Sequence, residues 1–117
     1  MSAEHELESL LDLDGLRYLI DEYLGLWVKL DAKRVVPSLH RPQGIKYSLS
    51  LHNKENQRLM GFDNAHAIET KYKIYDHWHQ HAKDEGQYYA FTTPAQLIED
   101  FWVVVDNLYK KMLENLS

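Results

Sequence analysis

Two short polar segments carry most of the side chains that could do chemistry in this chain. The segment YDHWHQH, residues 75–81, holds His77, His79 and His81 at intervals of two residues. In an extended strand, residues two apart point to the same face, so these imidazoles would form one row. Histidine exchanges protons near neutral pH and also binds metal ions, so the segment indicates acid–base catalysis or a metal site. An exposed strand end that merely tolerates histidines is the plain structural alternative.

The second segment is GFDNAHA, residues 61–67, which follows an apolar strand directly. Asp-Asn is a common turn dipeptide, so a simple turn is one reading. In the functional reading, the strand end delivers Asp63, Asn64 and His66 to a site shared with the histidine row. There Asp63 would orient a histidine or bind a cation, and Asn64 would donate to an anion. The candidate catalytic residues are Asp63, His66, His77 and His79.

Cationic side chains near these segments are candidates for binding a phosphate. Lys46 and Arg58 flank a predicted hairpin, and with Asn64 they form the predicted substrate-binding set. Each of these cations alone is also compatible with an ordinary solvated surface. An Arg or a Lys beside a histidine pair would stabilise the charge that develops at phosphorus.

Three hypotheses for function follow, in order of preference. In the first, the protein is a ribonuclease: one histidine deprotonates a ribose 2′-OH and a second protonates the leaving oxygen, without a cofactor. In the second, His77, His79 and His81 bind a divalent metal, with Asp63 as a further ligand. In the third, the chain is a non-enzymatic module that binds a partner protein.

The composition of the chain excludes several other kinds of functional site and several classes of protein. The 117-residue chain has no cysteine, which excludes disulfides, thiolate zinc sites and cysteine nucleophiles. It carries a net charge of −5, with cations concentrated between residues 29 and 73 and acids towards both ends. It has no phosphate-binding glycine loop, GxSxG or HExxH motif. A basic leader and a membrane-length apolar run are also absent, so we expect a soluble cytoplasmic protein.

The elements that must position these residues can be read from the hydrophobic pattern. Residues 26–36 and 45–52 are expected to form strands because they alternate apolar and polar residues with period two, and 58–64 is expected to return beside 45–52 as a hairpin. Residues 17–24 match a helical stripe about as well as a strand, and the preferred interpretation is a partner strand that turns near Gly25. Gly61 within a strand suggests a bulge or a close backbone approach. A further strand is expected over 71–81, and a short one over 88–91.

A long helix is predicted over the last 23 residues or so. Thr93 is a suitable N-cap, Pro94 suits the first helical position, and Gln96 completes a capping-box pattern. Its apolar stripe requires a sheet to cover. We therefore expect a single α+β domain over residues 1–117, with a mostly antiparallel sheet packed against this helix. Residues 1–15 are expected to be weakly ordered or to form a short helix.

Several segments of the sequence together resemble a known protein family. The run from GIKYSLSLHNKENQRLMGFDNAHA to YDHWHQH, followed by YYAFTTPAQLIEDFWVVVDNLY, resembles the TumE family of type II toxin–antitoxin toxins over residues 26–109. The resemblance implies a cytoplasmic prokaryotic toxin with a cognate antitoxin as partner. Ribonuclease activity is suggested by analogy with other small toxins, but no catalytic residues come with the resemblance. The oligomeric state stays open, a homo-oligomer included.

Overall fold

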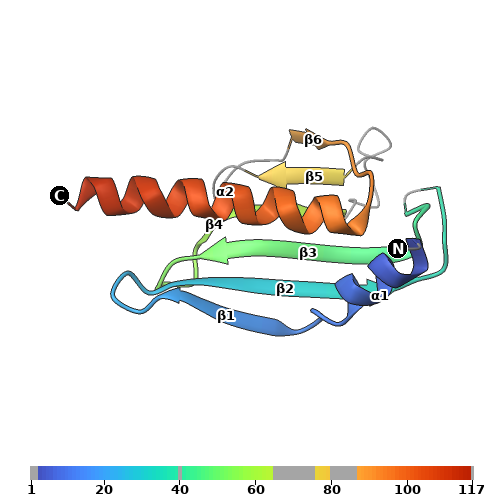
Figure 1. Ribbon diagram of the computed structural model, residues 1–117, viewed down its shortest axis with the longest axis horizontal. Coiled ribbons are helices and arrows are strands. Elements are labelled where there is room, and N and C mark those ends of the chain that lie inside the picture. Colours follow the sequence, from blue (N-terminus) through green and yellow to red (C-terminus); the bar gives the residue numbers. More distant parts are fainter. Residues whose placement is uncertain (1–2, 40, 65–75, 80–86, 117) are drawn as a thin grey trace.

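The computed structural model describes residues 3–39, 41–64, 76–79 and 87–116, with the backbone alone for 3–5, 76–79 and 87–88. Figure 1 shows a sheet with a long helix lying across one face and a short helix near the end of β2. The elements in chain order are α1 (Ala3–Leu11), β1 (Leu16–Asp21), β2 (Leu26–Arg34), β3 (Ile45–His52), β4 (Arg58–Asp63), β5 (Asp76–His79), β6 (Gln87–Tyr89) and α2 (Pro94–Asn115).

The six strands form one sheet in the order β1-β2-β3-β4-β5-β6, and every neighbouring pair is antiparallel. The predicted α+β fold, an antiparallel sheet against a long C-terminal helix, is confirmed. The first hairpin turns at Gly25, whose φ of 66° is readily adopted by glycine. An added Cβ there would lie 2.3 Å from the Cβ of Lys54, so the β1–β2 turn also approaches the β3–β4 turn closely.

Strict alternation in β2 and β3 builds the core on one face of the sheet. Val28 pairs with Leu51 and Leu30 with Leu49, and all four are at most 2% exposed. They share the core with the apolar stripe of α2, namely Leu97, Phe101 and Val105. Burying a side chain of this size stabilises the fold by about 1.5–3 kcal/mol, so this stripe is what fixes α2 to the sheet.

Hydrogen bonds fix the start of α2 and tie its C-terminal half to β1. At its start Gln96 N donates to Thr93 Oγ1, as the cap prediction required. The second half of the predicted capping box is wrong, because Gln96 Nε2 donates instead to Asp100 Oδ1 at 2.8 Å. Further along, Tyr109 Oη donates to Asp21 Oδ2 at 2.6 Å and so ties the helix to the end of β1.

The N-terminal segment forms a short helix, one of its two predicted states. Leu10 of α1 is completely buried in the core. Arg34 Nη2 contacts Glu8 Oε1 at 2.6 Å, which joins α1 to the end of β2. The helix therefore packs on the core beside both β2 and α2.

Gly61 is a close approach rather than a bulge. It pairs regularly with Ser50, and the ladder shifts register two residues earlier, where His52 pairs with Arg58 and Leu51 with Met60. A Cβ on Gly61 would lie 3.2 Å from the Leu49 carbonyl oxygen. The missing Cβ therefore relieves close contacts with the backbone of Leu49 and the side chain of Ser50.

Candidate functional site

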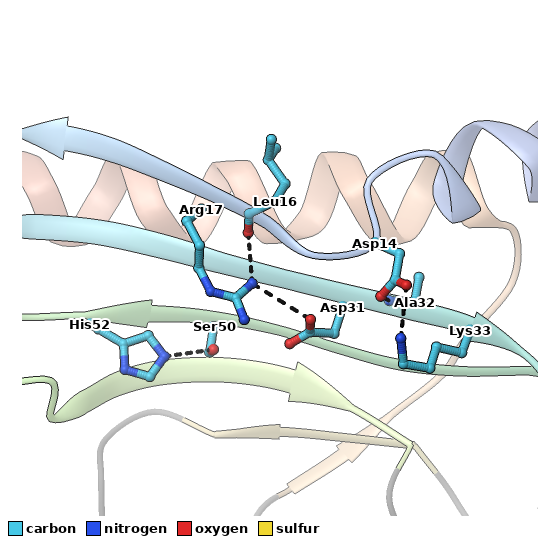
Figure 2. A network of polar contacts seen from close by, with 8 residues as sticks. All are labelled: Asp14, Leu16, Arg17, Asp31, Ala32, Lys33, Ser50 and His52. Atoms are coloured by element: carbon cyan, nitrogen blue, oxygen red, sulfur yellow. Dashed lines mark hydrogen bonds and ion pairs between the residues drawn. The ribbon is translucent and has the colours of Figure 1, made fainter.

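The face of the sheet that α2 does not cover is polar. Figure 2 shows its side chains on the near side of β1–β3, with α2 behind the sheet. The alternation that buries Val28, Leu30 and Leu49 turns their strand neighbours to this open face. Its described polar residues are Arg17, Lys29, Asp31, Lys33, Lys46, Ser48, Ser50, His52, Arg58 and Asp63.

A hollow of about 310 Å³ lies on this face and is lined by Asp31, Lys33, Lys46, Tyr47, Ser48 and Asp63. Three of these residues form one row across the sheet, because Asp31 pairs with Ser48 and Ser48 pairs with Asp63. Asp63 was predicted as a site residue from its own motif. Asp31 and Ser48 were not, although both occupy polar positions of the alternating strands, which was the signal available.

The two polar segments lie on adjacent strands. Asp63 of β4 pairs with His77 of β5, and Gly61 pairs with His79. The row Asp31–Ser48–Asp63 therefore continues to position 77, while position 79 belongs to the row of Ser50. His66 and His81 lie outside the described residues.

The two lysines of the hollow differ in their partners. Lys33 Nζ lies 2.9 Å from Asp14 Oδ2, and this hydrogen bond raises the pKa of Lys33. The same contact, aided by the Ala32 amide, lowers the pKa of Asp14. Lys46 is exposed and makes no ion pair with any described residue. Lys46 is therefore the better placed cation for an anionic ligand.

Asn64 does not serve the role expected for it. Its side chain is fully buried, accepts from Tyr47 N at 2.9 Å and donates to Ile45 O at 2.7 Å. The carboxamide thus continues the β3–β4 ladder past the end of β4. With no exposed surface, it cannot donate to an anion in the hollow, so Asn64 leaves the substrate-binding set as a structural residue.

Arg58 does not line the hollow. It begins β4, five residues before Asp63, and its side chain lies over Gly61. Its register partner is His52. The structure therefore divides the predicted substrate-binding cations, with Lys46 at the hollow and Arg58 at the start of β4.

The described residues include neither a group of metal-binding side chains nor a membrane-spanning helix. Among the described residues, no three His, Asp or Glu side chains are grouped as metal ligands. The side chains of His77, His79 and His81, the predicted metal ligands, lie outside the described part of the structure. Within the described ranges, no helix is both long and apolar enough to cross a membrane.

The fold and the site define a small α+β protein with one helix-covered sheet face and one open, charged face that bears a hollow. The sequence profile of a known family, Toxin TumE, matches residues 25–109. The chain belongs to this family, as its motifs predicted. The match runs from the end of the first turn to Tyr109, so α1 and β1 precede it. No curated protein and no solved structure matches the chain.

Proposed function

We propose that this chain is the toxin of a toxin–antitoxin pair and that it cleaves RNA at the hollow on its open face. One observation carries the proposal: Asp63 lines the hollow and pairs with His77 on the next strand. Directly paired residues of an antiparallel ladder belong to the same face. Position 63 of one motif and position 77 of the other are thus neighbours in the ladder, and Lys46 lines the same hollow as Asp63.

The reaction would use the substrate's own ribose as nucleophile. One histidine takes the proton of the 2′-OH, and O2′ attacks phosphorus as the bond from phosphorus to O5′ breaks. A second proton donor protonates O5′, which leaves a 2′,3′-cyclic phosphate and a free 5′-hydroxyl. We assign His77 to one proton-transfer role, with His66 or His79 as the other candidate. Asp63 would stabilise the protonated imidazole, and Lys46 would stabilise charge on the phosphoryl oxygens.

The cellular setting follows from the same proposal. A toxin of this kind would act in the cytoplasm, where RNA is accessible, and a cognate antitoxin would neutralise it. The net charge of −5 would limit non-specific RNA binding by the molecule as a whole. The open face is an exception, since most of its described charged side chains are cationic.

The test is cleavage of a labelled single-stranded RNA by the purified chain in EDTA. We expect wild type to yield 2′,3′-cyclic phosphate ends, and His77→Ala to lose about 10²- to 10⁴-fold in rate, the usual contribution of a general acid or base. Lys46→Gln should be slower, with a smaller loss. Lys110→Gln, an exposed cation on α2, is the matched control and should cleave like wild type.

The alternatives predict different results in the cleavage assay and in a growth assay. Unchanged cleavage by both His77→Ala and His79→Ala would remove these histidines from the mechanism. Cleavage that EDTA abolishes and a divalent metal restores would favour the metal-dependent reading. Growth arrest by a chain that cleaves no RNA would favour the partner-binding module.

A further inference from the structure

A second cationic group lies on the open face, beside the hollow. Its charged members are Arg17 of β1, Lys29 of β2 and Arg58 of β4, which surround His52 at the end of β3. Arg17 pairs with Lys29 across β1 and β2, and His52 pairs with Arg58 across β3 and β4. We call Arg17, Lys29, Arg58 and His52 the His52 cluster.

The three cations are close enough to act on the imidazole. Burial lowers the pKa of His52, and the charges of Lys29, Arg58 and Arg17 act in the same direction, against an opposing effect of the Asn56 backbone. Lys29 and Arg58 make no ion pair with any described residue. Arg17 lies 3.5 Å from Asp31, but both side chains are substantially exposed, so that contact is weak. Positive charge is therefore concentrated here in a chain that is acidic overall.

Hydrogen bonds and a ring stack hold the side chains beneath the cluster in place. His52 Nε2 lies 2.8 Å from Ser50 Oγ, and Ser50 is only 5% exposed. The His52 ring stacks on Trp27 with centroids 4.6 Å apart, and Trp27 Nε1 donates to Asn53 O at 3.0 Å. Figure 2 shows His52 turned towards Ser50, with Arg17 over the neighbouring strand.

The His52 cluster adjoins the hollow. Arg17 and Lys29 belong to the row of Ser50 and Gly61, and the Arg58 side chain lies over Gly61, where an added Cβ would be 3.5 Å from the Arg58 Cδ. The rows of Ser50 and Ser48 are two residues apart, or about 7 Å along the strand. A single extended polyanion lying on the sheet can therefore reach both the His52 cluster and Lys46.

We propose that the His52 cluster binds the phosphate backbone of single-stranded RNA and so holds the substrate across the hollow. The inference rests on the proposed ribonuclease function for the identity of the ligand. Arg58 and Lys29 would contact phosphates directly, and Arg17 would do so by releasing Asp31. Open antiparallel sheet faces that carry cations and aromatic rings bind single strands, whose backbone can follow the sheet.

The experiment measures binding separately from cleavage. A fluorescein-labelled single-stranded RNA with 2′-O-methyl riboses binds without being cut, because the attacking hydroxyl is blocked. Its affinity for the full chain is measured over a range of salt concentrations, for wild type and for Lys29→Gln/Arg58→Gln. The matched control is Lys110→Gln/Lys111→Gln, which removes two exposed cations from α2 on the other side of the sheet.

Loss of two phosphate contacts should weaken binding at low salt at least about tenfold and reduce the salt slope by about 1.4, at 0.7 per phosphate of a single strand. The control should bind like wild type. Equal affinity and slope for Lys29→Gln/Arg58→Gln and wild type would overturn the proposal, as would an equal loss in the control. Preferential binding of an acidic peptide over the RNA would also overturn it.

The results distinguish failure of the binding proposal from failure of the ribonuclease proposal. If the double variant loses RNA affinity while wild type cleaves no RNA, RNA binding by the His52 cluster is supported and the ribonuclease proposal is wrong. If the double variant binds RNA normally while His77→Ala abolishes cleavage, the ribonuclease proposal is supported and RNA binding by the His52 cluster is wrong. Thermal unfolding of each variant verifies that it is folded at the temperature of the assay.

Discussion

Replacing Asn64 with alanine should destabilise the protein without removing a reacting group. The variant leaves Tyr47 N and Ile45 O buried without the carboxamide that contacts them at 2.9 and 2.7 Å. A buried polar group without a partner costs about 1–3 kcal/mol, and because the costs of two groups that share one partner add to less than their sum, the two together should cost about 2–4 kcal/mol. That is a large part of the roughly 5–15 kcal/mol that stabilises a domain of this kind, but the chain should still fold.

Equilibrium unfolding in urea measures this loss. With a slope of about 2 kcal/mol per molar, the midpoint should fall by about 1–2 M, with the slope itself unchanged. Asn107→Ala, an exposed asparagine on α2, is the matched control and should change stability by less than about 0.5 kcal/mol. Below its unfolding transition, Asn64→Ala should keep the cleavage activity of wild type. A variant as stable as wild type but inactive would refute the reasoning and return Asn64 to the substrate-binding set.

Two further predictions concern pH. The hydrogen bond from Tyr109 lowers the pKa of Asp21 below its ordinary value of 3.8, so the stability that Asp21 contributes is present above that pH and lost as the pH falls below it. Tyr109→Phe should flatten this acid dependence in thermal unfolding, and an unchanged profile would contradict it. The pKa of His52 lies below 6.5, mainly through burial, so the unfolded chain takes up that proton first and stability should fall as the pH drops below 6.5. Residue-resolved NMR titration should place the His52 midpoint below 6.5, and His52→Gln should reduce the loss of stability.

Most of the fold could be predicted because its signals are local. Period-two alternation in residues 26–34 and 45–52 selects both the strand and its buried face. Thr93 and Pro94 mark the start of α2 before any contact is known. The family motifs are equally local, since a sequence profile reads residues in order.

Partnerships between distant residues were decided only by the tertiary structure. Asn64 reads as a turn residue or a ligand donor until β4 pairs with β3 and brings it to Tyr47 and Ile45, 17 and 19 residues away. The same register sets Asp63 beside Ser48 on one side and His77 on the other. A shift of one residue would reverse every face, so the hollow depends on the whole ladder. Sequence determined which side chains could do chemistry, whereas register and burial decided which of them can act together.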